Sequence, residues 1–430
     1  MTTDDSTSDW TGMNLIAGFA PDYRRGPVQP ARDSVPTPAR IAAAALARRP
    51  GWGLVREFYT DAEFYRHDLA RVFMRYWLFA GASVQIPKPG DYFLFEFADE
   101  SLVIVRAKDG GIRALFNVCK HRGSRICTLD KGHATALVCP YHQWTYDTEG
   151  RLTGARFMPK EFDKSEFPLD QAHVRVVDGL IFVSLAQDPP PFDLAARDMG
   201  AYIKPHGLES AKICHSKRYD LSCNWKLVIE NSRECYHCKV THQEYCKVMY
   251  GATLDRADSD WAGTLARHSP QWKRLGLETE AVPFTPSTWH HAGRLPFRDG
   301  ALTQSLDGKP VAPLMGSFTE YAIGASAVVA YPNFWFEASS DHAVTIRLTP
   351  VGPVATRMDV TWYVAADAVE GKDYDLSRVT AVWEATGSQD WKLCQDNQAG
   401  VNATRYRPGP YFQTEGELDG FVSWYLRQIA

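Results

Sequence analysis

Two short Cys–His pairs could hold a metal in the first half of the chain. One residue separates Cys119 from His121, two residues separate Cys139 from His142, and seventeen residues lie between the pairs. Thiolate and imidazole groups bind both zinc and the iron of iron–sulfur clusters. The four residues therefore predict a metal centre, with a tetrahedral zinc and an iron–sulfur cluster as the alternatives.

The spacing within the pairs favours the cluster. A zinc finger normally takes cysteines from its first pair and histidines from its second, whereas both pairs are mixed here. In a Rieske [2Fe–2S] centre two thiolates hold one iron and two imidazoles hold the other. The flanking residues, Cys-Lys-His-Arg-Gly-Ser at 119–124 and Cys-Pro-Tyr-His-Gln-Trp at 139–144, resemble the ligand loops of Rieske proteins. We therefore expect a Rieske cluster on these four residues.

A second group of possible ligands follows in the second half of the chain. Glu234 stands three residues before His237, so on a helix the two side chains share a face and the carboxylate can contact the imidazole. His242 comes five residues after His237, about 140° away around a helix of 3.6 residues per turn. Both imidazoles can therefore reach one ion only if the helix ends between them.

This stretch also allows a structural zinc site. Cys235 and Cys238 have a spacing that zinc accepts, and Cys246 and one histidine could complete the ligand set. The stretch resembles the mononuclear-iron motif of Rieske oxygenases, Glu/Asp-x2-His-x4-His, and the predicted cluster is an electron donor that needs an acceptor. We therefore favour iron over zinc.

Non-haem Fe(II) is commonly held by two histidines and one carboxylate, which leave three positions open. Asp390 and Asp396 are the candidates in a late predicted helix. In Rieske oxygenases the ligand aspartate stands eight residues before a recurrent glutamine, which is Gln398 here. The resemblance thus implies Asp390, with Asp396 a solvated helix residue.

Taken together, the motifs resemble the large (alpha) subunit of Rieske non-haem iron ring-hydroxylating-type oxygenases over nearly the whole chain beyond the N-terminal tail. Residues 224–238, Arg407 to Tyr411 and Trp424-Tyr425 are similar to glycine betaine monooxygenases and stachydrine (proline betaine) demethylases. That branch removes an N-methyl group from a quaternary ammonium as formaldehyde. The resemblance implies O₂, electrons from NAD(P)H through a separate reductase, and a head-to-tail homotrimer.

The resemblance also implies roles outside the ligand sets. Glu234 would bridge His142 of the next subunit to His237 on the electron path, and Asn231 is counted with it among the candidate catalytic residues. The chain departs from the branch at Ser232, where asparagine is usual, and at 334–342. Aromatic faces bind methylammonium groups, so a cation cage from Tyr331, Phe334 and Trp335 is conceivable, although such residues are more often core.

Elements that could position these residues follow from the local patterns. Residues 1–40 are rich in proline and should run extended, and 41–75 should form a helical part that packs on the catalytic domain. Short β-type runs and Asp-Gly turns place an all-β Rieske domain at 76–188, before three consecutive prolines. Residues 192–430 should form an α+β catalytic domain of helix-grip type, an antiparallel sheet covered by helices.

Composition and short sequence patterns limit the classes of partner and the location that can be expected. Lys and Arg total 47 and Asp and Glu 51, a net charge of −4, which argues against nucleic acid. The longest apolar run, 321–336, is broken by polar residues and proline and predicts a buried strand rather than a membrane span. We expect a cytoplasmic location because no signal peptide is evident, and in that compartment cysteines are metal ligands or core residues more often than disulfides. No Gly-x-Gly-x-x-Gly follows a strand, so flavin and nicotinamide binding belong to another protein.

Three other functions stay open at this point. Hydroxylation of an aromatic acid would use the same metals but would need a cationic group for the carboxylate. A pure electron carrier would leave some 240 residues and the second motif unexplained. A zinc-stabilised binding scaffold would hold neither iron site.

Overall fold

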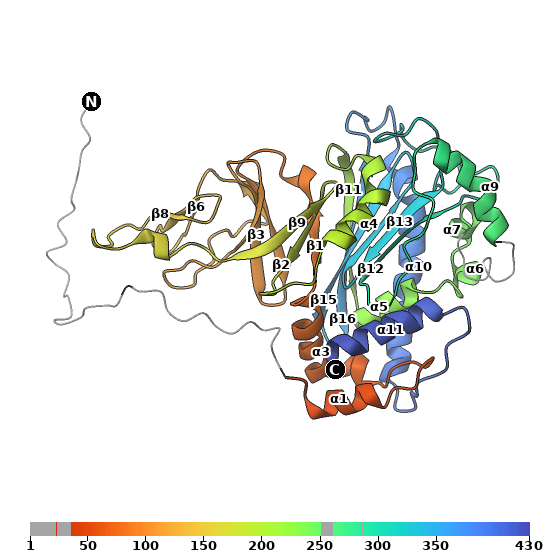
Figure 1. Ribbon diagram of the computed structural model, residues 1–430, viewed down its shortest axis with the longest axis horizontal. Coiled ribbons are helices and arrows are strands. Elements are labelled where there is room, and N and C mark those ends of the chain that lie inside the picture. The colour runs from red at the N-terminus through yellow and green to blue at the C-terminus, as the bar shows by residue number, and fades with distance from the viewer. Residues whose placement is uncertain (1–22, 24–35, 251–260, 286) are drawn as a thin grey trace.

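The computed structural model describes residue 23 and residues 36–250, 261–285 and 287–430. Two β-sheet units lie along its long axis (Figure 1). The predicted extended segment 1–40 falls outside these residues except for Tyr23 and 36–40. The predicted domain boundary at 188–192 stays a prediction, although the last strand of the first unit ends at Ser184 and the next helix begins at Asp193.

The first unit is an antiparallel sheet with a small second sheet at its far end (Figure 1). The larger sheet has the order β1-β10-β9-β4-β3-β2-β5. The predicted Asp178-Gly179 turn joins β9 to β10, and Gly179 has a φ of +89° with the Glu209 backbone 2.8 Å from where a Cβ would stand. The strands are β1 (Leu78–Ala82), β2 (Asp91–Phe97), β3 (Glu100–Arg106), β4 (Ile112–Phe116), β5 (Lys131–His133), β9 (Gln171–Val177) and β10 (Leu180–Ser184), and the small sheet has β6 (Leu137–Val138), β7 (Thr145–Tyr146) and β8 (Leu152–Gly154).

The second unit is built on a six-stranded antiparallel sheet of order β11-β16-β15-β14-β13-β12. The apolar run 321–336 contributes two strands to it rather than one. Pro332, which has no N–H for a ladder, lies in the turn between them. The strands are β11 (Lys212–Leu221), β12 (His290–Leu295), β13 (Ala325–Ala330), β14 (Phe334–Ala338), β15 (Ala343–Gly352) and β16 (Ala355–Val364).

Helices cover both faces of this sheet (Figure 1). Helix α4 (Asp193–Ile203) packs on β12 and β13, while α10 (Leu376–Asn402) contacts α5 (Trp225–Ser232) and α7 (Gln243–Val248) on the other side. The α+β expectation is therefore confirmed. The remaining helices are α1 (Ala39–Leu46), α2 (Glu57–Thr60), α3 (Ala62–Asp68), the π-helix η2 (Leu69–Phe73), α6 (Cys238–Thr241), α9 (Trp261–Arg274) and α11 (Gly416–Ile429).

One hydrophobic core runs through both units, so their orientation is fixed by packing. The ring of Phe334 on β14 lies 4.7 Å from that of Phe79 on β1 and 5.1 Å from that of Phe182 on β10. Asn333 Oδ1 accepts a hydrogen bond from Phe79 N at 2.8 Å. A second, smaller core lies under the loops that carry Cys119 and Cys139.

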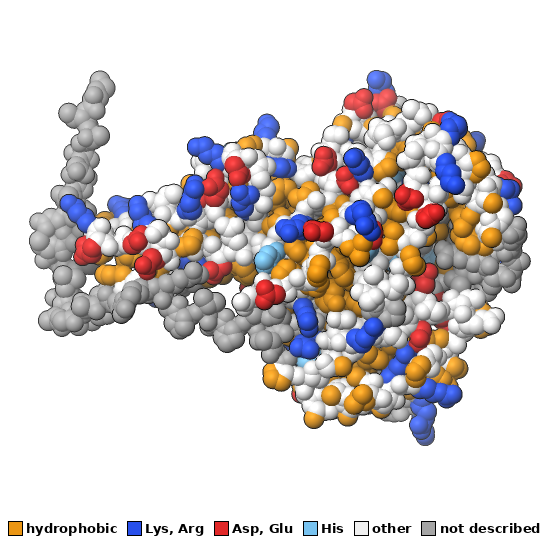
Figure 2. Space-filling model, in the orientation of Figure 1, with side chains coloured by type: hydrophobic (Ala, Val, Ile, Leu, Met, Phe, Trp, Pro, Cys, Tyr) orange, Lys and Arg blue, Asp and Glu red, His pale blue; other side chains and the backbone are white. Residues whose placement is uncertain are grey.

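The surface has no large field of one sign on the face in view, where acidic and basic side chains are interspersed (Figure 2). Among the helices of the described residues, none is both long and apolar enough to cross a bilayer.

A buried ion pair joins the N-terminal helices to the second unit. Asp68, at the end of α3, contacts the ammonium of Lys226 on α5, and both side chains are at most 1% exposed. The same carboxylate accepts hydrogen bonds from Trp225 Nε1 at 3.0 Å and from Tyr425 Oη at 2.6 Å. Burial lowers the pKa of Lys226, which Asp68 opposes. Asp68 thus ties α3, α5 and α11 together.

Replacing Asp68 with Ala should destabilise the protein by about 3–5 kcal/mol, because the Lys226 ammonium would stay buried without its carboxylate. Urea unfolding monitored by circular dichroism measures the effect. The control is Asp61→Ala at the N-cap of the same helix, where the carboxylate accepts from Glu63 N and the expected loss is about 1 kcal/mol. Equal losses in the two variants would contradict the role given to Asp68.

Candidate functional site

The two predicted cluster loops face each other at the outer end of the first unit. His121 Nδ1 lies 3.1 Å from His142 Nδ1, and Cys119 and Cys139 are buried close to one another. The structure therefore brings all four predicted residues together. Two δ-nitrogens about 3 Å apart suit two cis ligands of one metal ion, which fits a histidine-ligated iron.

Each loop is held in shape by its own backbone and by aromatic neighbours. Gly123 N donates to Cys119 O, and Gln143 N donates to Cys139 O, both from a residue with positive φ. The His121 ring stacks on Trp144 at 5.0 Å. The Oη of Tyr146 lies 3.5 Å from the sulfur of Cys119. Hydrogen bonds to ligand sulfurs tune cluster potentials, and the motif did not reveal that Tyr146 stands beside the sulfur of Cys119.

The second group lies in the connection between α5 and α7. Helix α5 begins at Asn224, whose side chain caps Lys226 N, and ends at Ser232. The helix considered above for Glu234 and His237 does not form, because the chain leaves the helical conformation over 233–237. His237 and His242 flank the four-residue helix α6, and the ending of that helix at His242 is the break that the spacing required.

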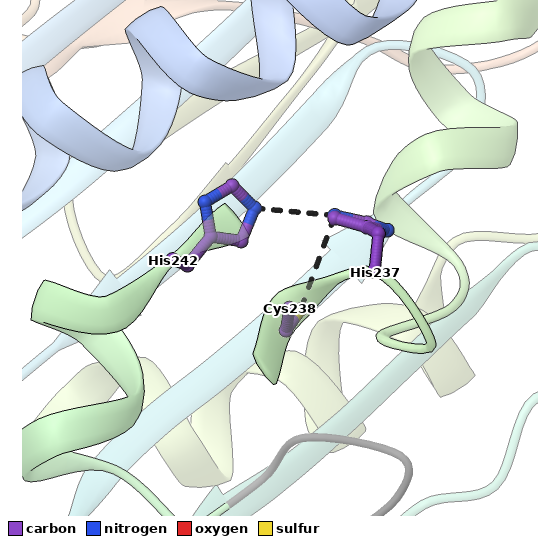
Figure 3. Close-up of side chains that lie close together, drawn as sticks. All are labelled: His237, Cys238 and His242. Carbon is purple, nitrogen blue, oxygen red and sulfur yellow. Dashed lines mark hydrogen bonds between the residues drawn. The ribbon is translucent and has the colours of Figure 1, made fainter. Parts of the chain in front are cut away.

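The donor atoms of His237, His242 and Asp390 form a small triangle. His237 Nε2 lies 3.1 Å from His242 Nε2 (Figure 3), and Asp390 Oδ1 lies 3.3 Å and 2.9 Å from these two nitrogens. Ligands about 2.1 Å from an ion and at right angles to each other stand about 3.0 Å apart. The triangle thus fits one face of an octahedral ion.

The charges of this triangle also suit a cation. Burial alone would lower the pKa of His237, but the carboxylates of Asp390 and Glu234 raise it to about 9. Burial would raise the pKa of Asp390, yet the two histidines hold it below its ordinary value. The site therefore stabilises positive charge at the point where the three donors meet.

Helix α10 delivers Asp390 and not Asp396 to the histidines. Asp396 pairs with Lys392 at the surface, and its side chain is 62% exposed. Gln398 on the same helix is buried, and its Oε1 accepts from Asn224 N at 2.8 Å, which ties α10 to the start of α5. The glutamine two turns after Asp390 therefore helps to position the helix that carries Asp390.

The outer nitrogens of the two histidines are both hydrogen-bonded. His237 Nδ1 donates to Glu234 Oε1 at 2.6 Å, so the predicted contact forms without a helix. His242 Nδ1 donates to Gln389 Oε1 at 2.7 Å. The Nδ2 of Asn231 lies 3.5 Å from His237 Nε2, on the inner side. The Nδ1 contacts leave Nε2 of both rings for a metal.

The cysteines beside His237 are not arranged for zinc. Cys235 and Cys238 form a disulfide, which is contrary to the expectation that the cysteines are ligands or core residues. The turn after α5 places their Cα atoms 4.9 Å apart, within disulfide range. Cys238 Sγ lies 3.9 Å from His237 Nε2 (Figure 3). The two cysteines therefore supply no pair of thiolates for the zinc site considered above.

The triangle opens on a cavity of about 480 Å³, a size suited to a small molecule. One wall is the sheet face formed by β12 to β16, and the other is formed by α5 to α7, α9, α10 and the segment 279–284. All five of Asn231, Glu234, His237, His242 and Asp390 line it.

Of the three aromatic residues considered for a cation cage, only one lines this cavity. Trp335 lines it, whereas Phe334 points to the opposite face of β14 and Tyr331 packs on Phe421 and Trp424 in the core. Alternation along a strand explains the separation of neighbours. Trp335 Nε1 donates to Ser232 Oγ at 3.2 Å, so the two departures from the branch meet in this wall.

Sequence reasoning missed two further residues of the site. Gln389 precedes Asp390, and the need of a ligand histidine for an acceptor at its outer nitrogen was a usable signal. Glu337 stands two residues after Trp335 on β14 and lines the same cavity. A single carboxylate in an apolar strand is the signal that could have revealed it.

Comparison with known proteins agrees with this geometry. The family of the Ring hydroxylating alpha subunit (catalytic domain) matches residues 208–430, and the Rieske [2Fe-2S] domain matches 76–172. Glycine betaine monooxygenase oxygenase subunits are 35% identical in Pseudomonas aeruginosa, over 91% of this chain and 93% of that protein, and 37% identical in Chromohalobacter salexigens, over 96% and 92%.

A solved structure shows the same fold. The quaternary ammonium Rieske monooxygenase CntA, in complex with an inhibitor, superposes with a TM-score of 0.70 at 18% identity, over 90% of this chain and 98% of that one. The match to the catalytic family rules out a pure electron carrier and a zinc scaffold. The chain belongs to the Rieske non-haem iron oxygenases, as an oxygenase subunit that uses a Rieske [2Fe–2S] cluster, a mononuclear iron, O₂ and electrons from a reductase.

Proposed function

We propose that this protein is the oxygenase component of a monooxygenase that N-demethylates a betaine-type quaternary ammonium. The observation that carries the proposal is the donor triangle of His237, His242 and Asp390 at the wall of a substrate-sized cavity. The similarity to glycine betaine monooxygenase subunits supports the choice of substrate class.

In the proposed reaction one methyl C–H bond is replaced by C–OH. O₂, two electrons and two protons are consumed, and one water leaves. The hydroxymethyl ammonium then loses its hydroxyl proton as its C–N bond breaks, and formaldehyde and a tertiary amine are released. The bound cluster would supply the electrons singly, and the bound iron would activate O₂ beside the methyl group.

The protein groups have separate tasks in this scheme. His237, His242 and Asp390 would hold the iron at the wall of the cavity. Glu234 keeps the proton on His237 Nδ1 and so fixes Nε2 toward the metal. Asn231 lies beside the same nitrogen, so its side-chain amide is available as a hydrogen-bond donor on the side of His237 that would face the iron.

We place the cluster and the iron that work together in different subunits of a homotrimer. In the folded molecule the cluster loops lie at one end, around β6 and β8. Helices α6 and α7 lie at the opposite end (Figure 1). Exposed apolar side chains occur at both ends, which favours contact between them. They are Val118, Leu129, Val138, Tyr141 and Phe157 on the first unit, and Tyr236, Val240 and Phe412 beside Glu234.

In the proposed trimer, Glu234 contacts His142 of the neighbouring subunit and passes the electron to His237. Its partial exposure beside Tyr236 and Val240 supports this position. A separate flavin or iron–sulfur reductase that takes electrons from NAD(P)H would serve the cluster, and we place the system in the cytoplasm.

The substrate class is tested with the reconstituted holoenzyme, chemically reduced and mixed with O₂. Glycine betaine, choline, carnitine and stachydrine are compared with salicylate and with a neutral aromatic hydrocarbon. We expect formaldehyde from at least one methylammonium compound and no product from the hydrocarbon. Hydroxylation of salicylate with no formaldehyde from any methylammonium compound would favour the aromatic-acid alternative.

Replacing His237 with Ala should remove the mononuclear iron and leave the two cluster irons, because one corner of the triangle is lost. Iron analysis and the visible spectrum of the cluster measure both sites in one sample. His291→Ala is the matched control, since His291 lines the same cavity outside the triangle and should keep the iron. Loss of the cluster spectrum from folded H237A would show that the two sites are wrongly assigned.

Replacing Glu234 with Gln should keep all the iron but slow cluster oxidation by about 100-fold, because the bridging charge is lost while the shape is kept. Single-turnover stopped-flow spectroscopy of the reduced cluster measures the rate. Glu244→Gln is the control, as this carboxylate accepts from Gln389 next to His242 and lies off the proposed path. An unchanged rate in E234Q would mean that electrons take another route.

A further inference from the structure

We propose that Glu337, with the ring of Trp335, forms the subsite for the cationic methylammonium group. The inference rests on the proposed function and assigns its recognition residue. Trp335 and Glu337 are two residues apart on β14, so both side chains project from the same face of the sheet into the cavity. An aromatic face and a carboxylate side by side are the groups that attract a cation without hydrogen-bond donors.

Apolar residues and two hydrogen-bond donors contact Glu337, and the more distant imidazole of His342, which contacts Asp341, also acts on its charge. Ala327 on β13 and Val344 on β15 pair with it across the sheet, and both line the cavity. Gln304 Nε2 and Tyr245 Oη, the latter at 3.1 Å, donate to Oε1. Among the described residues, none hydrogen-bonds Oε2. A carboxylate oxygen in such a wall lacks a counter-charge that a bound cation would supply.

The effect of burial on the pKa of the Glu337 carboxyl group also supports the proposed subsite. Desolvation raises the pKa of Glu337 to about 7, against the effect of its two donors. A positive group next to the carboxylate would favour its ionised form. A neutral or anionic ligand would gain no such stabilisation.

Two other acidic groups of the cavity are engaged at the triangle, and a third, Glu417 on α11, is exposed. Glu234 contacts His237, and Asp390 contacts both histidines of the triangle. Neither can neutralise a substrate cation without leaving its partner.

The two arginines of the lining contact groups other than Glu337. Arg233 Nη1 contacts His291 on β12. The guanidinium of Arg294 lies over the rings of Tyr202 and Trp272, at 6.0 and 5.9 Å, on the side of the sheet that α4 covers.

Hydrogen bonds connect Glu337 and Trp335 to residues that neighbour the triangle and Asn231 in sequence. Tyr245, which donates to its Oε1, lies on α7 three residues after His242. Ser232, one residue after Asn231, accepts from the Trp335 indole and fixes its ring. A trimethylammonium group between Trp335 and Glu337 would therefore present its methyl groups near the triangle.

Two pairs of ligands that differ only in charge test the subsite. Glycine betaine is compared with 3,3-dimethylbutanoate, and choline with 3,3-dimethylbutan-1-ol, by calorimetric titration of the holoenzyme. In each pair the quaternary nitrogen is replaced by carbon. We expect the wild type to bind the cationic member of at least one pair more than about tenfold tighter, ~1.4 kcal/mol.

Glu337→Gln should abolish this preference, while its amide oxygen can still accept from Gln304 and Tyr245. Glu337→Asp, which keeps the charge, should retain the preference even if both ligands bind more weakly. Glu417→Gln removes a different carboxylate from the same cavity and should also retain it. The cluster spectrum and iron content verify that each variant is folded and loaded.

The outcomes separate the two proposals. An unchanged preference in E337Q, or a preference lost in E417Q instead, refutes the subsite and leaves the demethylase function standing. Failure of the wild type to bind any of the four ligands refutes the subsite, and the formaldehyde assay with the wider methylammonium panel decides the demethylase function separately. If E337Q does not fold, the E337D comparison decides, because loss of the preference with the charge retained contradicts an electrostatic role.

Discussion

The contact between α10 and the α5–α7 segment is the interaction on which the iron site depends. A carboxylate and two imidazoles must meet in a buried space, and no single helix can supply all three. Helix α10 is fixed to its neighbours by side chains four or five residues apart: Gln389 accepts from His242, Cys394 donates to the Leu227 carbonyl, and Gln398 accepts from Asn224 N. Asp390 stands between the first two of these contacts, so its position follows from the packing of the helix.

Local spacing was enough to predict the residues that lie close together in the chain. Cys119, His121, Cys139 and His142 come from two short loops, and His237 and His242 flank one short helix, so the sequence distance limits the spatial distance. The helix break between the two histidines followed from geometry alone. The contact of Glu234 with His237 was predicted for the wrong reason, because a turn after α5 brings them together instead of a helical face.

Residues that meet across the sheet could not be placed in the same way. The register of β14 with β13 and β15 determines which face of β14 lines the cavity. A shift of one residue would exchange Trp335 for Phe334. Of the three aromatics considered for a cage, Trp335 therefore lines the cavity and Phe334 does not. Glu337 went unnoticed because its importance appears only when β14 is folded opposite α7, where Tyr245 donates to it. Asp390 was identified through family resemblance rather than physics.

The metal ligands come from helices and turns, whereas the proposed substrate contacts come from the sheet. Substitutions on β14 can therefore change the size or charge of the cavity while His237, His242 and Asp390 keep their positions. Ser232 is the point where the two systems touch, since it ends the helix before the iron motif and orients the Trp335 ring. A larger residue there would displace the indole directly, and it would reach the histidines only through the α5 terminus. Under the proposed function, this arrangement would allow one metal chemistry to serve differently shaped ammonium substrates, and the wall of β14 would decide which of them places a methyl group at the iron.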